Sequence, residues 1–587
     1  MKPLYRIRYD DMCCMHEVEN HTAERLGNSI QKRYLRFLDC QANLRAEIIV
    51  EQDLEFAVTK YTAHFYNDSD RAVRIYQFDA GFCVNANTLT LHYFTSDWGS
   101  EFFPQEKQIE NEFSFGSLSG RSCKGFEPWA GLVTPDRTYS IALAWSGSWN
   151  CTITPDQGNF KFSMGFSYPE FFIDVSPGGH LASASIYVAS GESLEDACLE
   201  LRRYFRARLS LLNDGGIADA LEYNGWWPYE DKHITEETYL ENARIAKEIG
   251  CRYAVLDVGW FGESKDGWGW YDKRGDWAIV NQNGFPSGIK ALCDNAKKIG
   301  ILPGIWCEIE AVGKHANLNH THPHIIAKRD GKPLGYVCLG SEEGRKWAMS
   351  VIERILGEYG AKWIKFDFNL DPAPGCNDPS HGHGPGDGLY AHYMGYYRLL
   401  KEVHRKYPDV VIENCSSGGL RMDIEMMSHA HWTHLSDPDY TEFHLQCFWG
   451  ALSYLHQSAC LHFSWSEVLG DHNLGIRNPI AEDMERYKFD YYIRAVLMGV
   501  PGFSYRLPQM PKWCLERLKE LCDFYAAIYK DFILNGDAHR LTGQPVMGGK
   551  GERFPVFQFT SRAGDVLMFA FRLNEARQEQ VVYPRGL

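Results

Sequence analysis

Three polar side chains alternate with apolar ones along one predicted strand. Lys365, Asp367 and Asn369 are separated by Phe366 and Phe368, so all three polar groups point to the same face of an extended segment. An ammonium group beside a carboxyl group keeps that carboxyl ionised, which suits a nucleophile. From these residues alone, a salt bridge with no catalytic role remains the other interpretation.

A second group of acids follows another predicted strand, at Ser436-Asp437-Pro438-Asp439. Two acids that flank a proline also fit a simple turn. A pair of carboxylates from two strands nevertheless has the chemistry for glycoside hydrolysis: one acid attacks the anomeric carbon, and the other protonates the leaving oxygen and then activates water. Asp437 is the candidate acid and Asp439 its main alternative. A pKa raised by burial or by the nucleophile's charge would mark the true acid.

Strand-like and helical runs alternate along the chain from residue 218 to 532. These elements carry the candidate acids Asp367 and Asp437 and must therefore position them. Helices are predicted at 236–249 and 342–359, each followed by a glycine, which is a common stop signal. Eight strand–helix units favour a (β/α)₈ barrel over an open doubly wound sheet, and catalytic residues of such barrels cluster at the C-terminal ends of the strands. The eight predicted strands are Glu222–Trp227, Tyr253–Trp260, Leu302–Glu308, Trp363–Phe368, Val410–Cys415, His431–Ser436, Cys460–Trp465 and Pro501–Tyr505.

Short strand-like runs with turn residues between them flank the barrel on both sides. We therefore predict an α/β protein with a central (β/α)₈ TIM barrel (213–534), an N-terminal β-sandwich (1–212) and a small C-terminal β-sheet domain (535–587). Further strands are expected at 45–50, 54–59, 72–78, 184–188, 555–560, 565–572 and 581–583. The chain stops soon after the last of these begins, which favours a trimmed C-terminus.

Composition excludes several classes of partner. The net charge of −16 disfavours nucleic acid and anionic membrane surfaces. No apolar stretch is long enough to span a membrane, and the first residues lack the apolar core of a signal peptide. The 17 cysteines include no C-x-x-C pair, which favours reduced thiols and a cytoplasmic location.

Histidine clusters raise a metal-dependent barrel hydrolase as a competing class. They fall in Asn-, Pro- and Gly-rich segments, not at strand ends with carboxylate partners. We therefore assign them to loops and expect neither a metal nor a cofactor. The histidines concerned are His315, His320, His322, His324, His381 and His383.

Several strings of the chain, in order, resemble those of the glycoside hydrolase family 36 α-galactosidases, within the wider melibiase superfamily. The resemblance covers nearly the whole chain. The strings are LHYFTSDWGSEF at 91–102, GWFG at 259–262, RGDW at 274–277, FPSG at 285–288 and ENCSSGG at 413–419.

The resemblance implies a role for seven residues. Asp367 falls on the family's nucleophile in a Lys-x-Asp motif, and Asp437 falls on the acid/base in a Ser-Asp motif. A retaining α-glycoside hydrolase that cleaves a terminal α-linked sugar through a covalent glycosyl-enzyme follows from this pair. The implied substrate-binding residues are Asp257, Trp306, Lys365, Cys415 and Gly418.

Three departures from the family's motifs alter the expected sugar site. Val258 replaces the second of two adjacent aspartates, which removes an acceptor for sugar hydroxyl groups and weakens discrimination. Ile309 replaces a proline between two glutamates, and Pro438 follows the candidate acid. The expected substrate is an oligosaccharide or glycoside of galactose, or of another sugar such as an α-N-acetylgalactosaminide or a 6-deoxy sugar.

Two other functions stay open. A raffinose-synthase-like transglycosylase uses the same carboxylate pair, and the acceptor subsite decides between transfer and hydrolysis. A non-catalytic sugar-binding protein is disfavoured because both carboxylates are present at the expected strand ends. The resemblance also implies a homo-oligomer.

Overall fold

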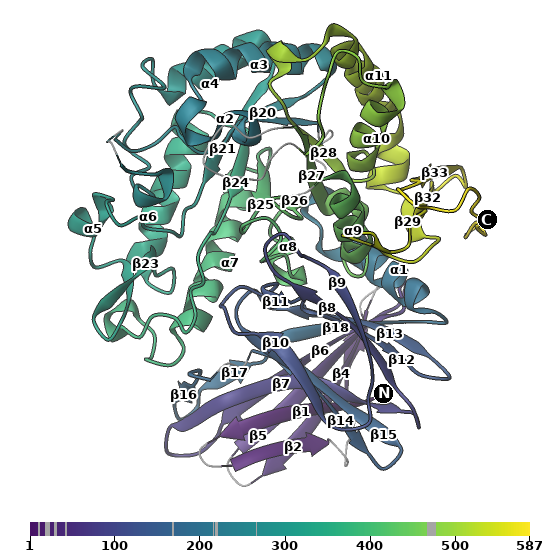
Figure 1. The fold of residues 1–587 in the computed structure, drawn as a ribbon. Helices are drawn as coiled ribbons and strands as arrows, with labels where there is room; N and C mark the ends of the chain where they lie inside the picture. Colours follow the sequence, from purple (N-terminus) through teal and green to yellow (C-terminus); the bar gives the residue numbers. More distant parts are fainter. Residues whose placement is uncertain are drawn as a thin grey trace.

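The computed structural model describes most of the chain (Figure 1). For residues 10–44 it describes at most the backbone. The residues outside the description are 10–11, 18–23, 29–31, 42–43, 167–168, 215–216, 218–220, 264, 266, 439, 467–476 and 587. In Figure 1 the barrel occupies the upper part of the molecule, the N-terminal sheets the lower part, and the C-terminal sheet lies at one side of the barrel.

Eight parallel strands close into a barrel, as the sequence predicted, and each lies within or next to its predicted run. The first strand pairs with the last, Glu222 opposite Gly502, which completes the ring. The strands are β19 (Glu222–Asn224), β20 (Tyr253–Leu256), β21 (Leu302–Cys307), β24 (Trp363–Phe366), β25 (Val411–Asn414), β26 (Trp432–His434), β27 (Cys460–Trp465) and β28 (Val500–Ser504).

Helices cover the outside of this barrel. Helix α3 (Glu236–Ile249) has the predicted bounds: Thr235 caps its N-terminus in a capping box, and Gly250 ends it with a φ of 107°. The predicted helix 342–359 is α6 (Glu342–Glu353), continued by a π-helical turn, Arg354–Glu358. The other long helices are α4 (Ile289–Ile299), α7 (Gly388–Lys406), α9 (Thr441–Ala451), α10 (Arg486–Val496) and α11 (Lys512–Ile528).

Two antiparallel sheets form the N-terminal unit. The first runs in the order β10 (Phe113–Ser117), β14 (Trp149–Asp156), β15 (Asn159–Gly165), β7 (Val73–Asn85), β1 (Lys2–Tyr9), β2 (Met12–Glu17). The second runs β11 (Gly125–Phe126), β8 (Thr90–Ser96), β12 (Trp129–Val133), β13 (Thr138–Ala144), β18 (Ser185–Gly191), β6 (Val58–Asn67), β5 (Leu44–Asp53), β4 (Lys32–Gln41), β3 (Glu24–Asn28). The predicted strand 54–59 is mostly wrong, because β6 begins only at Val58.

The C-terminal unit is a three-stranded sheet of β29 (Asp537–Arg540), β32 (Val556–Thr560) and β33 (Val566–Ala570). The strand predicted at 581–583 is wrong: this segment pairs with no strand, and Val581 and Tyr583 are exposed. We propose domain boundaries near residues 212 and 534, where the element type changes.

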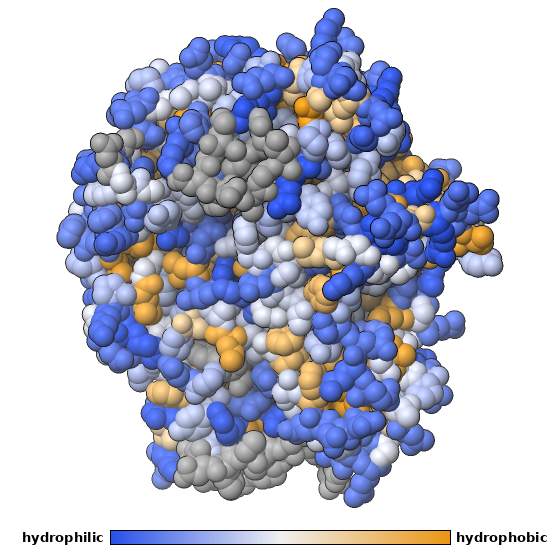
Figure 2. Space-filling view, viewed as in Figure 1, coloured by the Kyte–Doolittle hydropathy of each residue, from blue (hydrophilic) through white to orange (hydrophobic). Residues whose placement is uncertain are grey.

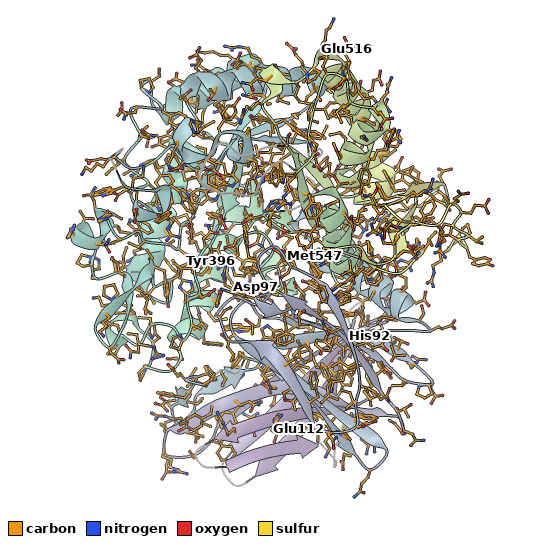
Figure 3. The ribbon with its side chains drawn as sticks, viewed as in Figure 1. His92, Asp97, Glu112, Tyr396, Glu516 and Met547 are labelled. Atoms are coloured by element: carbon orange, nitrogen blue, oxygen red, sulfur yellow. The ribbon has the colours of Figure 1, made fainter. Side chains whose placement is uncertain are left out.

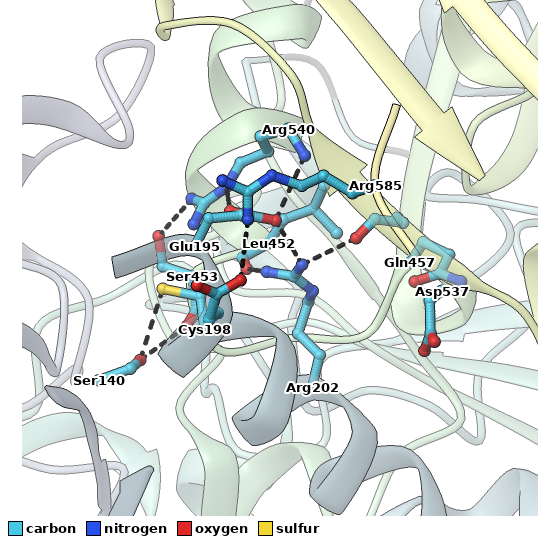
Figure 4. Close-up of polar contacts among 12 residues, drawn as sticks. Ser140, Glu195, Cys198, Arg202, Leu452, Ser453, Gln457, Asp537, Arg540 and Arg585 are labelled. Atoms are coloured by element: carbon cyan, nitrogen blue, oxygen red, sulfur yellow. Dashed lines mark hydrogen bonds and ion pairs between the residues drawn. The ribbon is translucent and has the colours of Figure 1, made fainter. Parts of the chain in front are cut away.

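Helix α1 (Leu194–Tyr204) joins the three units through a buried ion cluster (Figure 4). The carboxylate of Glu195 accepts from Arg202 at 2.8 Å and pairs with Arg540 of β29. Arg202 also donates to the carbonyl oxygens of Leu452, after α9, and of Ala538, in β29. Two almost fully buried guanidinium groups therefore share one carboxylate at the junction of helix, barrel and C-terminal sheet.

Hydrophilic residues cover most of the face drawn in Figure 2, and apolar residues form small separate groups on it. Among the described residues, no helix is both long enough and apolar enough to cross a bilayer.

We expect Glu195→Gln to destabilise the protein by about 3–5 kcal/mol, because it leaves two buried arginines without their counter-charge. The measurement is the free energy of unfolding in urea. The control is Asp523→Asn, which breaks an exposed pair with Lys519 and should cost less than about 1 kcal/mol. Equal losses from the two variants would contradict a structural role for the cluster.

Candidate active site

Asp367 lies directly after β24 and accepts four N–H groups. Oδ1 accepts from the backbone of Phe368 at 2.8 Å and of Ser417 at 3.1 Å. Oδ2 accepts from the Asn369 side chain at 2.8 Å and the Trp306 indole at 3.2 Å. With only 8% of its surface exposed, this carboxylate is held in a single orientation by donors from three strand ends.

The ammonium group of Lys365 points along the same face but pairs with a different acid from the one expected. Its Nζ lies 3.0 Å from Oδ2 of Asp257, at the end of β20, and 4.0 Å from Glu413 of β25. Burial opposes the charge, yet the carboxylates of Asp257 and Glu413 raise the pKa of Lys365 well above its usual value. Asp257 also accepts from Asn224 and from the backbone of Val258, at 3.0 and 2.9 Å.

Two further acids lie beneath this pair. Burial, only partly offset by Lys365, raises the pKa of Glu413 to about 7. Burial and the charge of Glu413 raise the pKa of Glu222 well above its usual value. The fully buried Glu222 therefore favours its neutral form, so that Lys365 has fewer negative charges to balance at the barrel centre.

Asp437 follows β26 and has a different environment from Asp367. Its Oδ2 accepts from the indole of Trp98 at 3.1 Å, and 26% of its side-chain surface is exposed. Burial, followed by the nearby charge of Asp367, raises the pKa of Asp437 to about 7. Burial and Lys365 hold the pKa of the neighbouring His434 well below its usual value, so its 3.7 Å contact with Asp437 is not an ion pair.

The N-terminal sandwich supplies part of this site. Figure 3 places Asp97, which follows β8, where the sandwich meets the barrel. The next residue, Trp98, has 42% of its surface exposed, although its indole N–H is bound to Asp437. The buried Glu101 accepts from Ser436 at 3.0 Å, which ties the same loop to the end of β26.

A tight turn after β25 carries Cys415 and Gly418. Gly418 has a φ of +76°, and a Cβ atom there would lie 2.4 Å from the backbone nitrogen of Asp437. Cys415 is buried, and its backbone N–H donates to the carbonyl oxygen of Phe366 at 2.7 Å. Only glycine permits this approach of the turn to the segment that bears Asp437.

Buried ion pairs surround the candidate catalytic groups. Both oxygens of Glu308 accept from Arg274, at 3.0 and 3.1 Å, and Glu308 also accepts from the backbone of Asn369 at 2.6 Å. Glu310 binds Arg421 through two hydrogen bonds, of 2.9 and 2.7 Å, and contacts His392 at 2.8 Å. Both glutamates already have cationic partners, which makes them supports for the strand ends.

The seven residues predicted from the sequence all lie at the C-terminal ends of β20, β21, β24, β25 and β26. The alternative acid, Asp439, lies outside the described residues. Sequence reasoning missed Glu222 and Asn224, although they alternate along β19 as Lys365 and Asp367 do along β24 and its end. It also assigned no role to Trp98, although this residue lies within the family string at 91–102.

Two family models match the chain. Residues 4–174 match the glycosyl hydrolase family 36 N-terminal domain, and residues 223–470 match the melibiase model. Together the matches cover more than two thirds of the chain. The chain belongs to glycoside hydrolase family 36.

Curated relatives are α-galactosidases. AgaA of Geobacillus stearothermophilus is 26% identical over 361 residues, which cover 58% of this chain and 48% of AgaA. Mel36A of Lactobacillus acidophilus is 27% identical over 325 residues, which cover 53% of this chain and 44% of that protein. The chain thus spans about half the length of these relatives.

Solved structures share the fold. A variant of AgaA in complex with stachyose superposes with a TM-score of 0.86 at 20% identity, covering 99% of this chain and 83% of that chain. The α-galactosidase of Lactobacillus brevis has a TM-score of 0.82 at 18% identity, covering 98% and 77%. The barrel and the N-terminal sandwich are therefore the architecture of this family.

We expect Gly418→Ala to destabilise the protein more than Gly331→Ala. Both glycines have a φ of +76°, but nothing lies within 4 Å of a Cβ at Gly331. Gly331→Ala should cost only the left-handed backbone strain of about 1–2 kcal/mol, whereas Gly418→Ala must also displace the backbone of Asp437. Thermal unfolding of both variants measures the difference, and equal losses would contradict this close packing.

Proposed function

We propose that the chain is a retaining α-glycoside hydrolase of the α-galactosidase type, with Asp367 as nucleophile and Asp437 as general acid/base. The observation that carries the proposal is the unequal environment of these two carboxyl groups, at the ends of the two strands that flank β25. Asp367 accepts four N–H groups, whereas Asp437 has a pKa of about 7 and stays partly accessible. A carboxylate held by four donors suits a nucleophile, and a partly accessible carboxyl group with a raised pKa suits a general acid.

In the first step, Oδ of Asp367 forms a bond to the anomeric carbon while the glycosidic C–O bond breaks. Protonated Asp437 gives its proton to the leaving oxygen. In the second step, Asp437 takes a proton from water, whose oxygen attacks the anomeric carbon and releases Asp367. The Trp98 indole holds Asp437 in place throughout because it donates to one oxygen and leaves the other for the proton.

Asp257, Trp306, Lys365, Cys415 and Gly418 form the proposed sugar subsite. Asp257 and Lys365 offer an acceptor and a donor for hydroxyl groups, and Trp306, whose indole N–H donates to Asp367, offers an aromatic ring. The buried Val258 adds no polar group. An α-galactoside is the proposed substrate, since the curated relatives are α-galactosidases.

We also propose that the chemistry needs no cofactor and that the protein is cytoplasmic. The fourteen cysteines whose side chains the structure describes are buried and form no disulfide with one another, which fits a reducing compartment.

A panel of aryl α-glycosides tests the substrate: galactoside, N-acetylgalactosaminide, glucoside, fucoside and xyloside. We expect the galactoside to be hydrolysed. We expect Asp367→Ala to lower kcat by about 10³-fold or more, because the nucleophile is lost. Azide should restore part of the activity of this variant. Release of a different sugar alone would make Val258 a specificity determinant. Residual activity of Asp367→Ala that azide does not increase would contradict the assignment of Asp367 as nucleophile.

The pH dependence of kcat/KM tests the acid. Because Asp437 must be protonated in the free enzyme, kcat/KM should fall as the pH rises through about 7. Trp98→Phe removes a donor to the carboxylate, so the pKa should rise and the alkaline limb should move to higher pH.

Asp437→Ala should abolish that limb and should reduce turnover of substrates with poor leaving groups far more than that of activated aryl glycosides. Equal losses on both kinds of substrate would argue against a general-acid role for Asp437.

A further inference from the structure

Two loops at the C-terminal face of the barrel bring four sulfur and nitrogen ligands together. Cys338 directly follows the hairpin of β22 (Ile326–Arg329) and β23 (Lys332–Val337), which rises from the end of β21. Cys376, His381 and His383 lie between β24 and α7. One ligand atom from each of these four residues lies within 4.8 Å of all the others.

The sulfur-to-nitrogen separations fit a shared ion. Sγ of Cys376 lies 3.3 Å from Nδ1 of His381, and Sγ of Cys338 lies 3.4 Å from Nε2 of His383. Ligands about 2.3 Å (sulfur) and 2.0–2.1 Å (nitrogen) from a tetrahedral zinc ion are separated by about 3.5 Å. These two separations match that geometry, and all four atoms lie close enough together to contact a single ion.

Both imidazoles use their outer nitrogen as a donor. Nε2 of His381 contacts the carbonyl oxygen of His324 at 2.8 Å, and Nδ1 of His383 contacts that of Gly384 at 2.8 Å. A carbonyl oxygen only accepts, so these nitrogens carry the protons. In the neutral imidazole the inner nitrogens then present lone pairs to the cluster, and this arrangement is the usual one for histidines that bind metals.

Backbone N–H groups point at the sulfur of Cys376. The amides of Lys328 and Asp378 donate to it, at 3.3 and 3.5 Å. Such bonds favour a thiolate, and the thiolate is the form that binds metals. The Lys328 amide belongs to the β22–β23 hairpin, so the hairpin and the loop after β24 meet at this sulfur.

The cluster is enclosed. Cys338, Cys376 and His381 have at most 2% of their surfaces exposed, and only His383 is partly accessible. The apolar side chains that pack with the two cysteines are Ala327, Tyr336 and Phe368. Burying two thiolates in such surroundings is costly unless a cation compensates for their charge.

We propose that Cys338, Cys376, His381 and His383 bind one structural zinc ion. Two thiolates and two imidazoles are the donor set of closed tetrahedral zinc sites, and the protein fills all four positions, leaving none for substrate or water. The sequence predicted His381 and His383 to be loop histidines without a metal. That prediction considered carboxylate partners at strand ends and did not consider the two cysteines.

The position of the site indicates what the ion does. Phe368, which packs in the same cluster, stands between Asp367 and Asn369 in the chain. The loop that the ion fastens is therefore the continuation of the strand that carries the proposed nucleophile. The zinc site does not depend on the proposed function, since it involves none of the sugar-site residues.

The first test is metal content. The full chain is produced in zinc-supplemented medium, purified without chelators or metal-affinity resin, and assayed by inductively coupled plasma mass spectrometry. We expect about one zinc ion per chain, and loss of most of it in Cys376→Ser. Cys293→Ser, which changes a buried thiol outside the cluster, should keep its zinc.

A second measurement keeps the proposal falsifiable if Cys376→Ser fails to fold. Replacing zinc by Co²⁺ should give the visible bands of tetrahedral cobalt and a thiolate charge-transfer band in the near ultraviolet. His383→Ala, at the accessible edge, should keep the charge-transfer band and lower the metal affinity by about tenfold or more.

Removal of the ion by a chelator should lower the unfolding temperature, while the protein that remains folded keeps its kcat. Wild-type protein that contains less than about 0.1 metal ion per chain and takes up none from buffered zinc would overturn the proposal. So would a mass lower by two hydrogens that maps to a Cys338–Cys376 disulfide. Loss of kcat before any unfolding would overturn the structural role.

Discussion

The buried ion pair between Lys365 and Asp257 is the constraint around which the barrel mouth is arranged. An ammonium group with almost no exposed surface is tolerated only where carboxylates surround it. The positive charge of Lys365 in turn stabilises the carboxyl groups of Asp257 and Glu413, which lie close together at the barrel centre. Glu413 and Glu222 respond through raised pKa values, so the centre of the barrel avoids an accumulation of negative charge.

Asp437 connects the barrel to the N-terminal sandwich. The indole of Trp98 binds one of its oxygens, and Glu101, from the same loop, binds the preceding Ser436. The turn at Gly418 packs against its backbone from the other side. A carboxyl group with a pKa near 7 therefore depends on two domains at once, and a barrel without its sandwich would lose the only indole donor described for this acid.

Buried ion pairs also stabilise the segments around the barrel centre. Glu308 with Arg274 fixes the backbone after β24, and Glu310 with Arg421 and His392 joins three segments beneath the loops. The proposed zinc site would join the β22–β23 hairpin to the loop between β24 and α7, which begins at Asp367. Each device compensates a buried charge with an opposite one, because a charged group removed from water is costly without a partner.

The sequence by itself determined the eight barrel strands, the bounds of α3 and the strand ends where Asp257, Trp306, Lys365, Asp367 and Asp437 lie. These features depend on local periodicity, glycine stop signals and family strings, which a linear chain displays directly. Only the tertiary structure decided that Lys365 pairs with Asp257, that Trp98 reaches Asp437 from another domain, and that Cys338 meets Cys376, His381 and His383. Each of these contacts joins residues far apart in the chain, and their separation is set by how strands and loops pack, which no local pattern encodes.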